Sequence, residues 1–269
     1  MIHEIQQSKN ITLTMDCGFP EARAVLDGNN PGWVFVDKPD LPGAALVWAQ
    51  GIEGFYLIGD ANCAVFQNEL DRFTDHALKP RLKELGITWL EISGDETWDA
   101  VIEKVYQGRS LEISQQYVYT LPADTRPEYF QRKPVIAPEI KRIDRELFGD
   151  LEIMSREFLF SKLNKFWGDA EAFMRGGFGY VLLVNEEIIS LCFSGFVAGN
   201  MHVIDIETKA AHQKKGYAEK VAQAYIADCI DRRFQPYWDC MVENIASARL
   251  AEKLGFKKSH LYTLYSLPL

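Results

Sequence analysis

The chain has 269 residues, enough for one large domain or for two of about 130 residues each. Hydrophobic residues make up 47% and charged residues 25%, values that are typical of a folded globular protein and that exclude a disordered chain. The formal net charge of −9 disfavours binding to the phosphate backbone of nucleic acids. It favours solubility and attracts cationic partners such as amines.

No apolar run is long enough to cross a membrane, and the polar N-terminal segment lacks the features of a secretory signal. The cysteines are odd in number, widely spaced and without a CxxC pair: Cys17, Cys63, Cys192, Cys229 and Cys240. This pattern disfavours a disulfide framework or a structural zinc site. We therefore expect a cytoplasmic protein that binds no metal, no membrane and no nucleic acid.

Strands and helices alternate along the first half of the chain. A long helical stretch carries Phe66, Leu70 and Phe73 on one face, and Pro80 should kink or divide it. A further helix is predicted at 98–106. Short apolar runs predict strands at 33–36, 43–49, 55–58, 88–93 and 117–120.

Four prolines with charges between them mark the segment from Pro122 to Pro138. Such a composition predicts a linker, or alternatively an ordered crossover segment. We therefore expect an N-terminal domain at 1–122, a linker or crossover at 123–138, and a C-terminal domain at 139–269.

The second half repeats the alternation. Helical periodicity predicts two short helices between 140 and 163, a long helix at 216–233 and a shorter one at 245–254. Strands are predicted at 179–184, 188–198, 201–208, 237–242 and 260–266. The fold class is α/β with a mixed sheet.

An offset of 146 residues aligns the two halves. It places the Tyr119–Pro122 segment on Tyr265–Pro268. It also places Phe55 on Met201, and each of these two residues starts a predicted strand. We interpret this as a diverged internal duplication; the alternative is that two α/β domains share element lengths by chance.

A polar loop that opens the long helix of the second half has the properties of an anion cradle. Backbone N–H groups at a helix N-terminus point outward, and the helix dipole favours negative charge there. Gly216 lets a phosphate approach the backbone, and Ala218 is small for the same reason. The loop consists of Gln213, Lys214, Lys215, Gly216, Tyr217 and Ala218. We expect a pyrophosphate to be the ligand of this loop.

This hexapeptide resembles motif A of the GNAT N-acetyltransferase superfamily, [Gln/Arg]-x-x-Gly-x-[Gly/Ala], which lies between a strand and a helix. The segment that starts at Asn244 and ends in Leu254-Gly255-Phe256 is similar to motif B of the same superfamily. The two motifs occur in the right order and at the right spacing. An ordinary strand–turn–helix would explain Gly216, but not Asn244 or Leu254-Gly255-Phe256.

The resemblance implies a GNAT fold in the C-terminal half and acetyl-CoA as the acetyl donor. A β-bulged strand at 204–208 would hold the pantetheine arm through the backbone of Ile206, Glu207 and Thr208. The loop at 213–218 would bind the pyrophosphate. The outer end of CoA would contact Asn244, Ser247 and Arg249, the last of which could equally be a solvated helix residue.

Acetyl transfer needs a base for the amine proton and a donor for the oxyanion. His202 begins the strand 11 residues before Gln213, where several GNAT enzymes place a catalytic Glu or His; the alternative is a hairpin or surface histidine. Asp205 and Glu207 are other candidate bases, on the opposite face by alternation.

Many family members carry a tyrosine seven residues after the motif B asparagine, as the acid for the leaving thiolate. Here that position is Ala251. Tyr217, Tyr225 and Tyr262 are possible substitutes, although helical periodicity makes Tyr225 a core residue. A thiolate needs little help to leave, because the pKa of a thiol is only about 8.5.

The acceptor site is predicted in the aromatic-rich segment 158–178, which corresponds to helices that line this site in the superfamily. Trp167 and Glu171, spaced i,i+4, form a candidate pair for binding a cationic amine. Core packing is the alternative for most of these aromatics.

In the first half, the offset places Leu70 where the second half has Gly216. Glu69 and Asp71 lie beside Leu70, and their carboxylates would repel a pyrophosphate. We therefore expect a GNAT-like frame in the first half that does not bind CoA.

The whole chain resembles the GNAT family that includes zwittermicin-resistance acetyltransferases. This implies transfer of an acetyl group from acetyl-CoA to a primary amine of a small molecule, such as an antibiotic-like aminopolyol. The alternative is a non-catalytic CoA-binding regulatory or interaction module. The sequence leaves the acceptor and the oligomeric state open.

Overall fold

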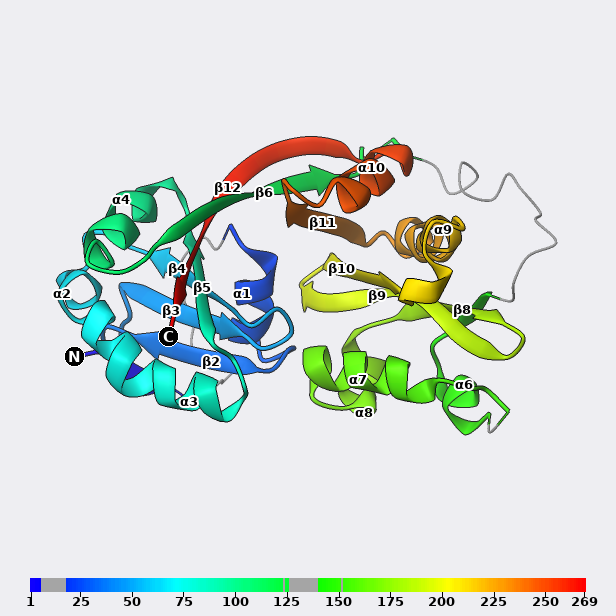
Figure 1. Ribbon diagram of the computed structural model, residues 1–269, viewed down its shortest axis with the longest axis horizontal. Coiled ribbons are helices and arrows are strands. Elements are labelled where there is room, and N and C mark those ends of the chain that lie inside the picture. Colours follow the sequence, from blue (N-terminus) through cyan, green and yellow to red (C-terminus); the bar gives the residue numbers. More distant parts are fainter. Residues whose placement is uncertain (6–17, 123, 126–139, 151) are drawn as a thin grey trace. The chain divides into compact units, whose positions relative to one another are not determined.

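A computed structural model describes residues 1–5, 18–122, 124–125, 140–150 and 152–269 (Figure 1). The chain folds into two compact units, which are described separately. The first unit contains Met1–Tyr117 and His260–Leu269, and the second contains Val118–Ser259. Apart from residues 124 and 125, the predicted linker 123–138 lies outside the described residues. Among the helices of the described ranges, none is long and apolar enough to cross a membrane.

The first unit is built on a mixed sheet whose strand order is β1-β2-β3-β4-β5-β12. The β4–β5 pair is parallel, and the other neighbours are antiparallel. The strands are β1 (His3–Ile5), β2 (Gly32–Val36), β3 (Ala44–Ala49), β4 (Gly54–Gly59), β5 (Trp89–Gly94), the first part of β6 (Glu112–Thr120) and the last part of β12 (Lys257–Pro268). The helices are α1 (Pro20–Leu26), α2 (Ala64–Phe73), α3 (Lys79–Glu84) and α4 (Glu96–Val105).

Helices cover both faces of this sheet. Alternate strand residues, among them Phe35, Trp48 and Leu57, form a core with Phe66 of α2 and Trp98 of α4. The helix α1 contacts β2 and β3. The helix that was expected to be divided by Pro80 is interrupted by a π-helical turn at Thr74–Leu78, and Pro80 stands in the first turn of α3, where its missing N–H is tolerated.

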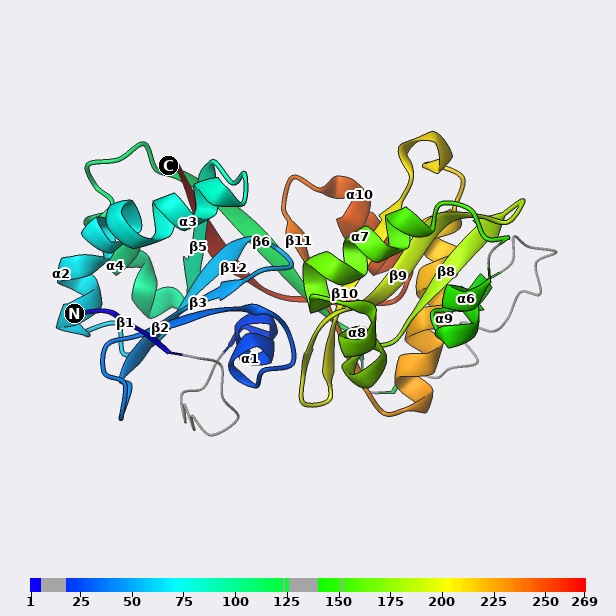
Figure 2. The same cartoon turned by 90° about the horizontal axis from the view of Figure 1, so that it is seen from below.

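The second unit has the strand order β6-β11-β10-β9-β8-β7, and helices cover both faces of its sheet. The helix α9 packs against β8 and β9, with α7 and α8 on the opposite face (Figures 1 and 2). The strands are the end of β6, β7 (Ile140–Arg142), β8 (Gly179–Val184), β9 (Glu187–Ala198), β10 (Met201–Thr208), β11 (Gln235–Met241) and the start of β12. The helices are α6 (Arg145–Gly149), α7 (Arg156–Trp167), α8 (Ala170–Gly176), α9 (Tyr217–Asp231) and α10 (Ile245–Lys253). The predicted α/β class with a mixed sheet is confirmed.

Aspartates at N-cap positions define where several helices begin. The carboxylate of Asp95 accepts a hydrogen bond from the backbone N–H of Thr97 at the start of α4. Asp144 and Asp169 do the same for α6 and α8. Each satisfies one N–H that has no partner within its helix, a contribution of about 1 kcal/mol.

The two halves run through the same order of strands and helices, but their last strands are exchanged. Residues Leu264–Pro268 of β12 pair antiparallel with β5 and complete the sheet of the first unit. The end of β6, from Val118, lies beside β11 in the second unit. The units therefore differ from the predicted domains 1–122 and 139–269, because strand pairing assigns residues 260–269 to the first unit.

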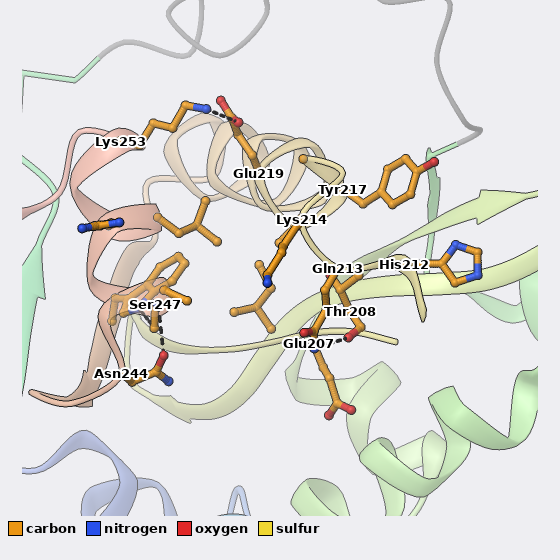
Figure 3. A pocket seen from close by; sticks show the side chains of 17 residues that line it. Glu207, Thr208, His212, Gln213, Lys214, Tyr217, Glu219, Asn244, Ser247 and Lys253 are labelled. Atoms are coloured by element: carbon orange, nitrogen blue, oxygen red, sulfur yellow. Dashed lines mark hydrogen bonds and ion pairs between the residues drawn. The ribbon is translucent and has the colours of Figure 1, made fainter. Parts of the chain in front are cut away.

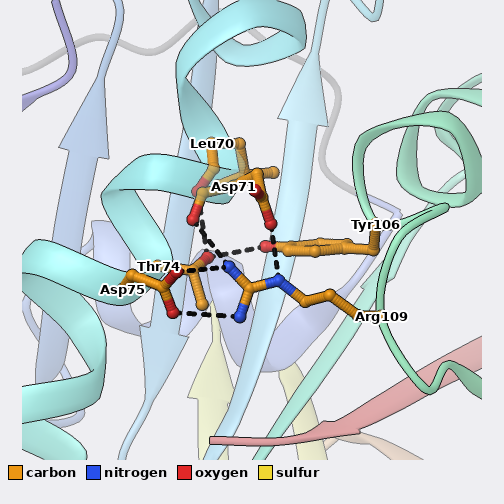
Figure 4. Close-up of polar contacts among 6 residues, drawn as sticks. All are labelled: Leu70, Asp71, Thr74, Asp75, Tyr106 and Arg109. Carbon is orange, nitrogen blue, oxygen red and sulfur yellow. Dashed lines mark hydrogen bonds and ion pairs between the residues drawn. The ribbon is translucent and has the colours of Figure 1, made fainter.

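An arginine clamp holds the π-helical turn of the first unit in place (Figure 4). Arg109 donates from Nε to the carboxylate of Asp71 (2.5 Å), from Nη1 to that of Asp75 (3.0 Å), and from Nη2 to the backbone carbonyl of Asp71 (3.0 Å). The hydrogen bond from Arg109 lowers the pKa of Asp75. Beneath it, the buried hydroxyls of Thr74 and Tyr106 lie 2.8 Å apart.

Replacing Arg109 by methionine should destabilise the first unit by roughly 1–2 kcal/mol, because the clamp joins two carboxylates and a carbonyl that are partly shielded from water. Thermal unfolding should report a melting temperature lower by about 4 °C. Arg72→Met, which changes an exposed arginine of α2, is the control. Equal effects of both changes would contradict a specific clamp.

Candidate functional site

The site begins where two parallel strands of the second unit separate. β10 and β11 pair only from Met201 to Val203, opposite Gln235–Tyr237. Beyond Val203, β10 continues its antiparallel ladder with β9 alone, up to Thr208. The residues from Ile204 onward therefore have one side of the backbone turned to an opening rather than to a strand. The extra residue of the bulge at this point is Gly195 of β9 and not, as expected, a residue of β10.

The loop after β10 turns back and starts α9 with two residues in the left-handed region. Lys214 has a φ of 62° and Gly216 a φ of 76°, the second at the N-cap of α9. The Gln213 side-chain amide donates to the carbonyl of Thr208 (3.2 Å), which fixes the loop to the strand. The backbone N–H groups of the first turn of α9 have no partner within the helix and are directed out of its N-terminus. This is the geometry that favours an anion.

The third wall is the start of α10. The side chain of Asn244 caps this helix by accepting a hydrogen bond from the N–H of Ser247 (3.1 Å). The hydroxyl of Ser247 in turn accepts from the indole Nε1 of Trp238 on β11 (2.9 Å). Two motif B residues thus fix α10 to β11, on the far side of the opening from β10.

Between these walls lies a cavity of about 670 Å³, here called the β10–α10 pocket (Figure 3). It brings together all of the predicted cofactor residues except Lys215, whose ammonium donates to the carbonyl of Ala211. The lining residues are Ile206, Glu207, Thr208, His212, Gln213, Lys214, Gly216, Tyr217, Ala218, Glu219, Trp238, Asn244, Ala246, Ser247, Arg249, Leu250 and Lys253.

Positive charge is available in this pocket although the protein is acidic. Within the part of the chain that the structure describes, neither Lys214 nor Arg249 forms an ion pair. Lys253 pairs with Glu219 (2.5 Å), and Glu207 pairs with Lys162 of α7 (2.5 Å), so both carboxylates in the lining have a cation beside them. Two unpaired cations next to a helix N-terminus favour a ligand with several negative charges.

A sequence profile of the GNAT acetyltransferase family matches residues 20–265. The chain belongs to the GNAT acetyltransferase family. It is 26% identical to the uncharacterized N-acetyltransferase YdfB of Bacillus subtilis over 243 residues, which are 90% of this chain and 88% of that protein.

Two solved structures share the fold. The GCN5-related N-acetyltransferase-like protein from Streptococcus suis has a TM-score of 0.64 and 24% identity, covering 93% of this chain and 94% of that one. A tandem GNAT protein from the clavulanic acid biosynthesis pathway has a TM-score of 0.57 and 11% identity, covering 100% of this chain and 98% of that one. The predicted GNAT fold is confirmed.

Several lining residues of this GNAT pocket were not predicted. Ala246 and Lys253 lie on the same face of α10 as the predicted Arg249, and the 3.6-residue period extended from Arg249 would have found them. Leu250 directly follows Arg249 and lies about 100° around the helix from it, so that period does not find it. Glu219 lies in the first turn of α9. Trp238 carries no local signal, because its position depends on β11 lying across the opening.

The structure does not support His202 as a catalytic base. Its side chain is 2% exposed, its Nδ1 lies 2.9 Å from the Ser194 hydroxyl, and its ring stacks on Phe234. Burial, and after it the charge of Arg232, lowers the pKa of His202 from 6.5 to about 4. A base must reach the substrate, and this imidazole is enclosed in the core.

Trp167 and Glu171 do not form the predicted acceptor pair. Gly168, with a φ of 79°, ends α7 directly after Trp167, so the two residues lie on different helices and lose the i,i+4 relation. Trp167 is buried and donates to the carbonyl of Ser194 (2.8 Å), while the exposed Glu171 pairs with Arg145 (2.9 Å). The aromatic side chains of α7 and α8 that are buried serve the core.

The candidate tyrosines are also separated by the fold. Tyr225 is buried against Ser194, and burial raises its pKa well above the usual value. Tyr262 belongs to the first unit and packs on Phe19. Tyr217 lines the pocket, but its ring points to the same side as His212, away from Asn244 and Ser247 (Figure 3). Over the described ranges, no three His, Cys, Asp or Glu side chains meet as metal ligands.

The buried His202 should make the protein sensitive to acid. The unfolded chain takes up this proton near pH 6.5 and the folded protein only near pH 4, so acidification through this range favours unfolding, by roughly 3 kcal/mol at pH 4. His202→Asn, which can keep the hydrogen bond to Ser194, should reduce this loss in urea unfolding measured from pH 7 to pH 4. His76→Asn, which changes an exposed histidine, is the control, and the same slope in all three proteins would refute the assignment.

Proposed function

We propose that this protein transfers an acetyl group from acetyl-CoA to a primary amine of a small molecule. The observation that carries the proposal is the β10–α10 pocket, in which both GNAT motifs meet. It combines a strand edge released from pairing, a helix N-terminus behind a left-handed glycine, and two cations, Lys214 and Arg249, that form no ion pair with any described residue.

We assign the parts of acetyl-CoA to the pocket residues by their chemistry. The N–H groups at the start of α9 and the Lys214 ammonium suit a pyrophosphate. An added Cβ at Gly216 would meet no atom within 4 Å, so the backbone there is open to an approaching ligand. The free side of β10 at Ile206–Thr208 offers amide groups to a pantetheine arm, and Arg249 offers its guanidinium to the outer phosphate.

When bound, acetyl-CoA supplies an activated thioester and a thiolate leaving group. The amine must be neutral to attack, yet the pKa of an alkylamine in water is about 10. We assign the removal of its proton to Glu207, whose half-exposed carboxylate lines the pocket. As the amine nitrogen bonds to the carbonyl carbon and the C–S bond breaks, a backbone N–H of β10 that faces the opening stabilises the oxyanion.

Calorimetry with acetyl-CoA tests the pocket. One binding site per chain is expected, because residues 67–72 of the first unit lie inside α2 instead of forming a loop. Gly216→Asp should weaken binding at least about 100-fold, since it adds a negative charge and a side chain at a positive φ. Lys214→Ala should weaken it about 5–10-fold through the loss of one charge-assisted contact.

The controls use matched residues of the same unit. Gly199 has a φ of 60° and open surroundings in the β9–β10 turn, so Gly199→Asp introduces the same strain outside the pocket. Lys215→Ala changes the neighbouring lysine, which does not line the pocket. If the control variants lose affinity as much as the test variants, or if wild type does not bind at millimolar acetyl-CoA, the proposal is wrong.

Glu207→Gln tests the base. The thiol released from acetyl-CoA should form about 10²–10⁴-fold more slowly, with unchanged acetyl-CoA affinity, because the amide cannot accept the proton. Glu186→Gln, an exposed change in the β8–β9 turn, is the control. Aminopolyols are the first acceptors to test, since the chain resembles the family that includes zwittermicin-resistance acetyltransferases. Full activity of Glu207→Gln would remove Glu207 from the mechanism.

A CoA-binding module without turnover is the second candidate. It is favoured by Ala251, which is fully buried at the position where many relatives carry a tyrosine acid, and by the burial of His202. This candidate predicts tight acetyl-CoA binding with no thiol release across the amine panel. Detectable turnover with any amine decides for the enzyme.

A further inference from the structure

A lysine of α7 lies between two carboxylates of β10, beside the β10–α10 pocket. The Lys162 ammonium is 2.5 Å from Oε2 of Glu207 and 3.5 Å from Oδ2 of Asp205. Only Glu207 of these three lines the pocket. The lysine side chain is 23% exposed, so it is largely shielded and its charge needs a partner.

The two carboxylates hold this lysine unequally. Glu207 is at hydrogen-bonding distance, whereas Oδ2 of Asp205 is buried and accepts no hydrogen bond from any described residue. A buried carboxylate oxygen that accepts no hydrogen bond is uncommon in folded proteins, so this one needs a physical explanation. The separation of 3.5 Å means that a small movement of the ammonium would bring it into hydrogen-bonding contact with Asp205.

The surroundings of Asp205 leave Lys162 as its nearest counter-charge. Lys165 of the same helix also acts on it, Glu207 opposes it as a like charge, and the buried thiol of Cys192 lies on β9. Burial raises the pKa of Asp205, and Lys162 opposes that rise. Burial also opposes the charge of Lys162, but the two carboxylates together raise its pKa above the usual value.

We propose that Lys162 is shared between these carboxylates during catalysis, and that it passes from Glu207 to Asp205 when Glu207 accepts the proton of the acceptor amine. This rests on the proposed function, in which Glu207 is the base. Lys162 and Asp205 are then positioning residues.

The charges balance in both states. Before transfer, one ammonium lies between two carboxylates. After transfer, the proton is on Glu207, and its carboxyl group is neutral and no longer holds a cation. Without Asp205, protonation of Glu207 would leave the shielded ammonium of Lys162 without a partner, which is strongly unfavourable. Asp205 removes this penalty and so makes Glu207 a more effective base.

The inference can be tested without an acceptor, by NMR titration of the full chain labelled with ¹³C at aspartate carboxyls. Asp205→Asn identifies the resonance. Glu207→Gln imitates the protonated glutamate and should release Lys162 to Asp205, which lowers the titration midpoint of Asp205. Part of this lowering has another cause, because Glu207→Gln also removes a negative charge that raises the Asp205 midpoint. Glu207→Gln is therefore also made in a Lys162→Met background, where only the loss of that negative charge can shift the Asp205 midpoint.

We expect the shift with Lys162 present to exceed the shift without it by at least one pH unit. Equal shifts in the two backgrounds would overturn the proposal. Lys209→Met, which breaks the separate pair with Glu187, should leave the Asp205 midpoint unchanged. If Lys162→Met does not fold, Lys162→Gln takes its place, because it removes the charge and keeps a hydrogen-bond donor.

A kinetic readout separates this inference from the proposed function. With an amine that is accepted, Asp205→Asn should lower kcat at least 10-fold, leave acetyl-CoA affinity unchanged and shift the pH profile; wild-type kcat in this variant would overturn the sharing of Lys162. Absence of acetyl-CoA binding to the wild type would refute the proposed function. The titration contains no acetyl-CoA, so it would still report whether Lys162 moves to Asp205 when Glu207 loses its charge.

Discussion

The separation of β10 from β11 after Val203 is the constraint on which the site depends. A parallel pair continued to Thr208 would satisfy the backbone of β10 and leave no opening. Because the ladder ends early, the side of β10 that faces away from β9 has no partner strand at Ile206–Thr208, and the pocket forms in the gap. Two tethers, Gln213 to Thr208 and Trp238 to Ser247, fix its opposite walls. The site thus forms where strand pairing is missing, and neighbouring side chains hold the walls of the opening in place.

The first unit shows what happens when the same frame loses its loop. Residues 67–72, which align with the phosphate loop under the offset of 146, lie inside α2, and Leu70 is fully buried in the core. Backbone N–H groups inside a helix are bound to its own carbonyl groups and are not available to a phosphate. The chain there stabilises the helix with the Arg109 clamp instead of a ligand. The same frame therefore differs between the units in where its helix begins. In the first unit α2 begins before the aligned segment, whereas in the second unit α9 begins within the loop at 213–218 and its first N–H groups can meet a ligand.

The sequence was most informative where function depends on local backbone. The loop at 213–218 was predicted because glycine and small residues before a helix report local backbone geometry. Asn244 was predicted from its resemblance to motif B, and its role as the cap of α10 comes from the structure. The exchange of β6 and β12 was not predictable, because strand pairing between distant segments leaves no local pattern. His202 was misjudged for a related reason: alternation gives the face of a strand, but not what packs on it. The i,i+4 prediction for Trp167 and Glu171 assumed one continuous helix, but Gly168 ends α7 between them.

Charges of opposite sign lie at neighbouring places in the second unit, as the proposed function requires. Lys214 provides positive charge where α9 begins and Arg249 provides it on α10, whereas Glu207 and Asp205 provide negative charge along β10, balanced by Lys162. At physiological salt, the net charge of −9 is screened over about 8 Å, so it does not prevent an anion from binding to cations that it contacts directly. In the proposed function, the net charge acts on the encounter with a cationic amine, and the local cations act on the anion. The proposed function thus places an anionic donor and a cationic acceptor along the same strand of an acidic protein.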